Sequence, residues 1–380
     1  MKKKKIAIVS GSRAEFGILK NLIINLKKKK KYKLSFIVTG SHLSKKFGET
    51  VNEIYQSKIK IDFKIKLTLN DKTDKDTLLN LSIGLQKFAN FFSRNKFDLI
   101  IILGDRWEIF AAGIASNFFK IPIVHIHGGE STKASIDDSI RHSLTKMSFF
   151  HFVSTKKYRQ KVINMGESPN RVFNVGALAG DNIKNFKPIK KEILENDLKV
   201  KLNDKCFLVT FHPETLSKIP PVKQIKIVIS ALKKFKDLNF IFTFPNAETG
   251  SSSIIKILKK ECKENKNFTC FKSLGQFKYF SVMYYCKGLI GNSSSGIIEA
   301  PYMHKINFNI GDRQFGRIRT KNTIDVPLST KKIVVSIKKF YKKKINVTKN
   351  PYGNGTAAKK ITKILDRIKI PENNQKEFYI

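Results

Sequence analysis

Residues 99–142 constrain the fold of this chain more than any other stretch. Residues 99–103 (LIIIL) and 123–126 (IVHI) form apolar runs that are too short for helices and rich in β-branched side chains. Such runs are typical of buried parallel strands. Each is followed by a glycine-bearing turn that carries aspartate, arginine, histidine or glutamate. Because ligands bind at the carboxyl ends of the strands in an open α/β sheet, this stretch predicts an active-site crevice.

The same alternation of apolar runs and helical segments continues along the whole chain. Further strands are predicted at 6–10, 34–38, 63–67, 149–154, 171–175, 206–211, 240–244, 268–271, 288–290 and 305–309. The pattern predicts two Rossmann-like, doubly wound α/β domains that face each other across a cleft. We place the first domain at residues 1–183 and the second at 184–355, with the lysine-rich segment 184–201 as a linker. Residues 356–380 hold a final amphipathic helix.

The charge of the chain limits its partners. The formal net charge is +43, from 73 Lys and Arg against 30 Asp and Glu, and such a charge suits an anionic partner. The hydrophobic fraction of 41% and the charged fraction of 27% are ordinary for a soluble globular protein. We therefore favour a lysine-rich solvated surface. The sequence has no RNA-binding aromatic motif or zinc-finger spacing, so we expect no nucleic-acid partner.

Three features bear on where the protein works. The basic residues 1–5 imitate the start of a signal peptide, but the apolar run after them ends at Gly11 and predicts a first strand instead. No apolar run approaches the ~18 residues of a membrane span. The four cysteines lack metal-ligand spacing and are interpreted as reduced thiols. We therefore expect a cytoplasmic protein without a membrane partner.

Residues 291–299 (GNSSSGIIE) predict a phosphate-binding turn in the second domain. A strand, a Gly/Ser-rich turn and a helix N-terminus follow one another, so that backbone N–H groups and the Ser293 and Ser294 hydroxyls face an anion. Glu299 lies one turn into the helix, where it can accept a hydroxyl proton from a ribose or sugar. The spacing is not that of a P-loop and no lysine follows, which argues against ATP with Mg²⁺. The alternative is a plain N-capped helix.

Other strand ends carry groups suited to phosphates and sugar hydroxyls. Arg13 follows the first strand and offers a forked donor. In the second domain, His212, Asn246 and Arg313 each follow a predicted strand. A histidine at such a position can donate to a phosphate, although a lone histidine is more often a structural residue.

Asp105 and Asp137 are the candidate acid–base groups of the first domain. Asp105 directly follows a strand, and the alternative for it is a salt bridge to Arg106. Asp137 and Asp138 open a helix, with Ser135 as a possible cap at capping-box spacing from Asp138. Capping then explains one of the two aspartates and leaves the other for chemistry.

The residues His125, His127 and Glu130 could suggest a metal site. A Gly-Gly turn separates His127 from Glu130, and no supporting ligand pattern is present. We therefore expect neither a metal nor a cofactor.

Taken together, these motifs resemble the UDP-N-acetylglucosamine 2-epimerase family, and in particular its hydrolysing branch in sialic-acid and legionaminic-acid synthesis. The matching segments are 12–15, 39–44, 104–106, 125–130, 136–142, 211–213, 244–251, 291–299 and 311–314. The resemblance implies a GT-B-like pair of Rossmann domains with a nucleotide sugar in the cleft, held mainly by the second domain. It also implies a C-terminal helix that packs back on the first domain, and a homodimer.

In this family the base removes the sugar's C2 proton while UDP leaves from C1, and water then adds to the glycal intermediate. The resemblance assigns Asp105 and Asp137 to the carboxylate positions. The residues that it or the motifs assign to substrate binding are Arg13, His42, Arg106, Arg141, His142, His212, Asn246, Ser293, Ser294, Glu299 and Arg313.

The chain departs from the family at its frequent third carboxylate, where His127 stands. Glu130 is our preferred replacement, and His127 itself is the alternative. The loop after Glu130 also suggests the branch that acts on a 2,4-diacetamido-trideoxy sugar, so the sugar and the base stay open. Competing functions are a non-hydrolysing 2-epimerase, which returns a nucleotide sugar, a GT-B glycosyltransferase, which needs an acceptor, and a basic nucleic-acid-binding protein.

Overall fold

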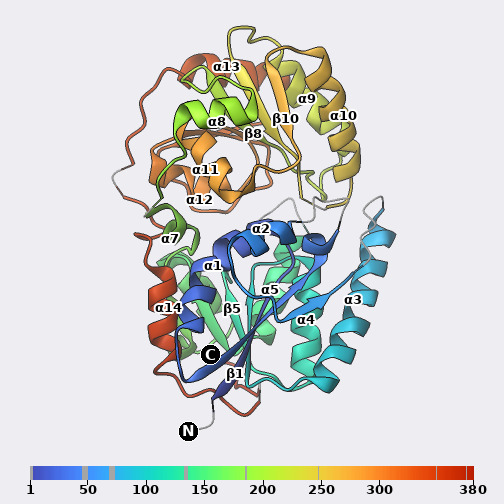
Figure 1. Ribbon diagram of the computed structural model, residues 1–380, viewed down its shortest axis with the longest axis vertical. Coiled ribbons are helices and arrows are strands. Elements are labelled where there is room, and N and C mark those ends of the chain that lie inside the picture. Colours follow the sequence, from blue (N-terminus) through green and yellow to red (C-terminus); the bar gives the residue numbers. More distant parts are fainter. Residues whose placement is uncertain are drawn as a thin grey trace.

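The computed structural model describes residues 3–44, 50–67, 73–131, 136–184, 186–246, 248–347, 349–373 and 375–380. Within these residues the chain forms two α/β units, which lie one above the other in Figure 1. Each unit is built on a sheet whose paired strands are all parallel. The predicted fold class, a GT-B-like pair of Rossmann-like domains, is confirmed.

The first unit holds a sheet of strand order β3-β2-β1-β4-β5-β6-β7. Its strands are β1 (Lys4–Ser10), β2 (Tyr32–Thr39), β3 (Phe63–Ile65), β4 (Leu99–Leu103), β5 (Ile123–Ile126), β6 (Phe150–Val153) and β7 (Val172–Asn174). Its helices are α1 (Arg13–Lys27), α2 (Val51–Gln56), α3 (Asp74–Arg94), α4 (Trp107–Phe118), α5 (Asp137–Met147), α6 (Lys156–Asn164) and α7 (Ala179–Lys184).

The second unit holds a sheet of strand order β10-β9-β8-β11-β12-β13. Its strands are β8 (Cys206–Thr210), β9 (Asn239–Thr243), β10 (Phe268–Phe271), β11 (Gly288–Gly291), β12 (Ile306–Ile310) and β13 (Thr323–Val326). Its helices are α8 (Lys191–Leu198), α9 (Pro221–Leu232), α10 (Ser251–Glu264), α11 (Gly275–Tyr285), α12 (Ser295–Ile298) and α13 (Thr330–Phe340).

Alternate residues of the central strands pack into opposite layers. In β4, Ile101 joins the core that holds α1 residues, whereas Ile100 and Ile102 join the core that holds Phe88 of α3. Both faces of the sheet are therefore covered by helices, as a parallel sheet requires. This explains why the strand is a continuous apolar run with no polar alternation.

The last helix, α14 (Ala357–Leu365), packs on the first unit beside α1 (Figure 1). Its first turn is capped by Asp181, whose carboxylate accepts hydrogen bonds from Ala357 N and Ala358 N at 2.8 and 2.9 Å. Chain continuity alone would leave this helix with the second unit, so the apolar contact with α1 decides its place. The domain boundaries at 183 and 355 stay predictions.

Some elements differ from the sequence prediction. The lysine-rich segment proposed as a linker contains α8, which buries Leu194 and Leu198 in the core of the second unit. The edge strand β13 and helix α13 were not predicted. The helix that follows the Gly/Ser-rich turn ends at Ile298, and a 3₁₀ turn that contains Pro301 follows, because proline cannot donate to an α-helical ladder.

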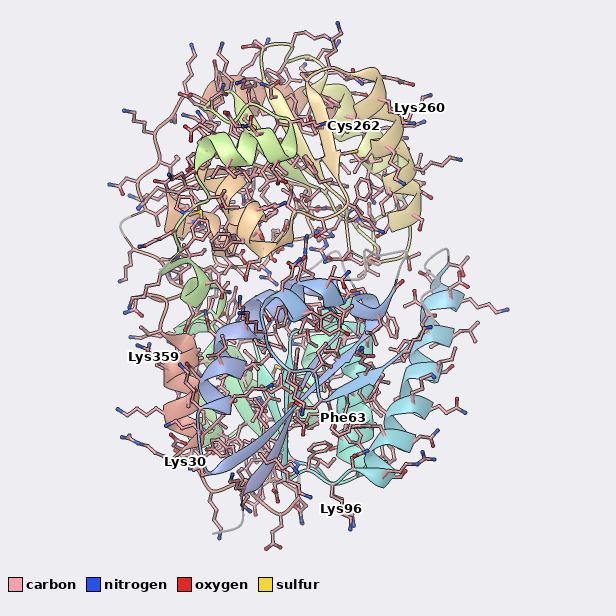
Figure 2. All side chains as sticks on the ribbon, viewed as in Figure 1. Lys30, Phe63, Lys96, Lys260, Cys262 and Lys359 are labelled. Atoms are coloured by element: carbon pink, nitrogen blue, oxygen red, sulfur yellow. The ribbon has the colours of Figure 1, made fainter. Side chains whose placement is uncertain are left out.

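The surface lysines account for the charge of the chain. The labelled side chains of Lys30, Lys96, Lys260 and Lys359 are exposed and point outward from both units (Figure 2). Among the described residues, no helix is both long enough and apolar enough to cross a membrane.

Candidate active site

A cleft between the two units collects the predicted site residues. It is lined by turns that follow β1, β4 and β5 in the first unit and β8, β9, β11 and β12 in the second. The predicted residues on its wall are Arg13, Asp105, Arg106, His127, Glu130, Asp137, Arg141, His212, Asn246, Ser293, Ser294, Glu299 and Arg313. The carboxyl ends of both sheets therefore open onto one space, as expected for open α/β sheets.

Two predicted substrate-binding residues lie elsewhere. His42 is fully buried within the first unit, where its ring nitrogens lie 2.9 Å from Ser10 Oγ and 3.0 Å from Thr50 Oγ1. Burial lowers the pKa of His42 to about 3, so it is a neutral residue that fixes the turn after β2. His142 does not line the cleft either, because it sits on α5 with its Nε2 3.5 Å from Asp138 Oδ2, one helical turn away.

Asp105 pairs with a distant arginine. Its Oδ2 accepts a hydrogen bond from Nη2 of Arg141 on α5, whose side chain is almost fully buried. The alternative salt bridge from Asp105 to Arg106 is not the one formed, because Arg106 Nε donates to Glu108 Oε1 at 2.7 Å and lies 3.7 Å from Glu15 Oε1. The Asp105–Arg141 pair links the end of β4 to α5 and so fixes the position of one relative to the other.

The start of α5 brings Asp137 to the cleft. The helix begins at Asp137, and its N-cap residue Ile136 supplies no side-chain cap. Ser135, the proposed cap, lies outside the described residues, so the capping-box prediction stays untested. Asp137 Oδ2 lies 4.0 Å from Nη2 of Arg313, which belongs to the second unit.

Glu130 contacts His127, Ser154 and Arg317 in the cleft. Nδ1 of His127 lies 3.3 Å from Oε1 of Glu130, and the same oxygen accepts a hydrogen bond from Ser154 Oγ at 2.7 Å. The other carboxylate oxygen lies 3.0 Å from Nη1 of Arg317. Both oxygens of Glu130 are thus engaged, whereas Nε2 of His127 has no hydrogen-bond partner among the described residues.

The backbone at His127 is strained. Its φ is +67°, a left-handed value that costs a non-glycine residue free energy. Burial lowers the pKa of His127, Glu130 raises it, and Arg317 lowers it again. An unpartnered ring nitrogen on a strained turn at a cleft is typical of a functional group.

The second unit presents His212 as a neutral donor. Burial holds the pKa of His212 well below its usual range, and Arg313, Arg106 and Arg13 lower it further. Nδ1 accepts a hydrogen bond from the Asn246 backbone N–H at 3.3 Å, so the ring proton of the neutral form lies on Nε2. This tautomer suits His212 to donate to an anionic oxygen.

Arg313 is fixed on the wall of the cleft. Its Nη2 donates to Glu248 Oε1 at 3.0 Å, and its backbone N–H donates to Glu214 Oε1 at 3.1 Å. Ser293 and Ser294 face the same space at the start of α12. Burial raises the pKa of Glu299, at the end of that helix, to about 7.

Several lining residues were missed by the sequence reasoning. They are Glu15, Thr210, Thr243, Glu248, Gln276, Tyr279 and Arg317. Glu15 and Glu248 lie inside the segments 12–15 and 244–251 that carry the family resemblance, but the resemblance was not used to assign them to the site. Arg317 follows the predicted Gly311–Gln314 motif by three residues, and Tyr279 had no local signal because it lies within α11.

Among the described residues, no group of three or more His, Cys, Asp or Glu side chains is arranged to hold a metal ion. The cations of the cleft are arginines instead. Arg13, Arg106, Arg141, Arg313 and Arg317 all line it. Such a set suits a ligand that carries several negative charges, because guanidinium groups bind phosphate oxygens through paired donors.

Comparison with known proteins identifies the family. The profile of the UDP-N-acetylglucosamine 2-epimerase family matches residues 24–366. The chain belongs to this family. It is 40% identical to the polysialic acid biosynthesis protein P7 of Escherichia coli, over 99% of this chain and 97% of that protein. The epimerase is also 42% identical to the GDP/UDP-N,N'-diacetylbacillosamine 2-epimerase (hydrolyzing) of Campylobacter jejuni, over 86% of this chain and 85% of that protein.

A solved structure shares the fold of the epimerase. The UDP-GlcNAc 2-epimerase of Neisseria meningitidis, bound to UDP-GlcNAc, superposes with a TM-score of 0.81 at 20% identity and covers 96% of this chain and 100% of that one. The resemblance inferred from the sequence, including the hydrolysing branch, is confirmed by these relatives.

Glu15 gives a pH-dependent test of the cleft's electrostatics. Burial raises the pKa of Glu15 to about 8, with Glu108 raising it further and Arg106 opposing. Unfolded Glu15 releases its proton above about pH 4.5, so the parent protein loses stability as pH rises from 4.5 to 8. Glu15→Gln removes this loss. We expect its melting temperature relative to the parent to rise by about 4 °C or more between pH 5 and pH 7.5.

Differential scanning calorimetry at the two pH values measures this shift. Glu264→Gln, at an exposed position of α10, is the matched control, and its difference from the parent should stay constant. A Glu15→Gln difference that is equally constant with pH would show that Glu15 is ionised in the folded protein.

Proposed function

We propose that the epimerase hydrolyses a UDP- or GDP-activated 2-acetamido sugar with inversion at C2 and releases the nucleoside diphosphate and the free manno-configured sugar. The observation that carries this proposal is the pairing, across one cleft, of acid–base groups with five arginines. Asp105, Asp137 and the His127–Glu130 pair belong to the first unit, and Arg313 and Arg317 reach them from the second. The name of the hydrolysing relative from Campylobacter jejuni supports the same reaction class.

The first step removes the C2 proton. The electron pair of the C2–H bond forms the C1=C2 double bond while the C1–O bond breaks and its electrons leave on the UDP oxygen. A sugar C2–H is a weak acid, so the step needs a positioned base and stabilisation of the leaving diphosphate. The arginines and the neutral His212 supply donors for that diphosphate.

The second step adds water to the glycal. The water oxygen bonds to C1, a proton is delivered to the opposite face of C2, and the displaced proton of the water passes to a base. Two acid–base groups on opposite faces of C2 are therefore required. The carboxylates Asp105 and Asp137 provide one side, and His127 with Glu130 provides the other.

Within this scheme the structure favours His127 over our preferred Glu130 as the group that touches the sugar. Ser154 and Arg317 occupy the two oxygens of Glu130. The carboxylate also lies beside Nδ1 of His127, which favours the tautomer whose proton is on Nδ1. The lone pair of Nε2 is then available as a base. Glu130 acts as the residue that orients His127.

The proposed sugar and the proposed pathway rest on the names of the relatives. The names of the two relatives refer to polysialic acid and to a diacetylbacillosamine nucleotide. We propose the second class, a 2,4-diacetamido-trideoxy sugar, beside N-acetylglucosamine as the substrates to test, with a place in nonulosonic-acid synthesis of the sialic or legionaminic type. A homodimer and a cytoplasmic location stay predictions.

The function is tested by product analysis in D₂O. The protein is incubated separately with UDP-N-acetylglucosamine and with the UDP and GDP forms of N,N'-diacetylbacillosamine, and NMR follows the products. We expect UDP or GDP and a free sugar that carries one deuterium at C2. A UDP-manno sugar would instead indicate the non-hydrolysing reaction, and turnover only after addition of an acceptor would indicate a glycosyltransferase.

A pair of variants tests the assignment of the base. We expect His127→Gln to lower kcat by ~100-fold or more, the usual scale for a general base, and Glu130→Gln to lower it by ~10-fold because the orienting amide remains. Asp105→Asn is the positive control, with a loss as large as that of His127→Gln. UDP affinity should stay within about threefold in all three variants. A dead Glu130→Gln beside an active His127→Gln would show that Glu130 is the acid–base group.

A further inference from the structure

Arg317 reaches from the second unit to the acid–base groups of the first unit. It lies in the segment that follows β12, and its side chain is only 9% exposed. Nη1 lies 3.0 Å from Oε2 of Glu130, which belongs to the first unit and is itself 1% exposed. A buried carboxylate is costly unless a cation and hydrogen bonds satisfy it. The contact with Arg317 therefore stabilises the buried carboxylate of Glu130.

The backbone beside Arg317 is docked on the first unit and on the C-terminal segment. Ile318 N donates to Tyr158 Oη at 3.0 Å, and Tyr352 Oη donates to Ile318 O at 2.8 Å. On the other side, Gly316 has a φ of +89°, and a Cβ there would meet Ser131 Cβ at 2.8 Å. The close approach and the two tyrosine bonds fix where the guanidinium enters the cleft.

We propose that Arg317 of the second unit is a positioning residue that holds Glu130, and through it His127, in the catalytic arrangement. The inference rests on the proposed function, because it needs His127 to act in the reaction. Because Arg317 belongs to the second unit, the position of Glu130 depends on both units.

The alternative is that Arg317 is a diphosphate ligand like Arg313. Both arginines line the cleft, so position alone does not separate the two roles. Arg313 Nη2 is held by Glu248 of its own unit and lies 4.0 Å from Asp137. Arg317 lies beside the carboxylate across the interface instead. The first role predicts an effect on kcat, whereas the second predicts an effect on nucleotide affinity.

The charge of Arg317 also gives a pH signature. The groups that face His127 are Glu130 on its own turn, Arg317 from the second unit and His125 at the end of β5, and Asp105, Asp137 and Arg141 line the same cleft. Glu130 raises the pKa of His127 and Arg317 lowers it, after burial as the largest cause. Removing Arg317 leaves the carboxylate uncompensated, so the pKa of His127 rises. The acid limb of the pH profile of kcat then moves to higher pH, because a higher pH is needed to form neutral His127.

The variants are Arg317→Met, Arg317→Gln and Arg317→Lys in the full-length protein. We expect Arg317→Met to lower kcat by ~30-fold or more, with KM and the Kd for UDP within about threefold, and to move the acid limb of kcat upward by about half a pH unit or more. Arg317→Lys keeps the charge and should restore part of the loss. Arg317→Gln keeps a donor, and it carries the test if Arg317→Met does not fold.

The matched control is Lys321→Met. Lys321 lies four residues along the same segment, and its side chain is exposed. Lys321→Met removes one positive charge from that segment, and we expect kcat and the acid limb to stay as in the parent.

A double variant separates positioning from an independent contribution. If Arg317 acts through Glu130, Glu130→Gln with Arg317→Met should be no slower than Glu130→Gln alone, within about threefold. Losses that multiply would overturn the proposal, as would an Arg317→Met variant that binds UDP more weakly but keeps kcat and the acid limb.

Failure of this inference is distinguishable from failure of the proposed function. A parent protein that releases no free sugar, or a fully active Glu130→Gln, would reject the function or its assignment whatever Arg317 does. An impaired Glu130→Gln beside an unaffected Arg317→Met would reject only the role of Arg317.

Discussion

The ion pair between Glu130 and Arg317 joins the two α/β units inside the cleft, with 3.0 Å between Oε2 and Nη1. A buried charge without a partner is costly, and three carboxylates of the cleft each have an arginine beside them. Asp105 has Arg141, and Glu248 has Arg313. Because Arg313 and Arg317 come from the second unit, the electrostatic balance of the acid–base groups depends on both units. The site therefore needs residues of both units.

The same arrangement separates two tasks that the reaction must combine. Leaving-group stabilisation needs positive charge, whereas proton removal needs a neutral or anionic base. The first unit supplies the bases, at the turns after β4 and β5, while arginines of both units and the neutral His212 surround them. Glu130 contacts both His127 and Arg317, and its charge opposes the effect of Arg317 on the pKa of His127. Parallel strands make this possible, because they present every turn at one edge of the sheet.

The fold and most of the cleft could be predicted from local sequence. Continuous apolar runs such as Leu99–Leu103 identify buried parallel strands without any knowledge of their neighbours, and the turns after them carried most of the lining residues. What escaped prediction depends on distant contacts. Helix α8 was hidden by lysines because only Leu194 and Leu198 are buried in the core. His42 resembled a ligand by its position after a strand, yet Ser10 and Thr50 enclose it. The partner of Asp105 lies 36 residues away, and that of Glu130 comes from the other unit, so no spacing rule could find them.

The central claim is that the cleft places His127, oriented by Glu130, against C2 of a nucleotide-bound sugar. A crystal structure of the epimerase with UDP and the 2-acetamidoglucal tests it most directly. The account predicts UDP against the second unit, near Ser293, His212 and Arg313, and Nε2 of His127 as the nearest base on one face of C2, within about 3.5 Å. Glu130 should still contact Arg317. A Glu130 carboxylate that has left Arg317 and lies against C2, with His127 turned away, would contradict the account.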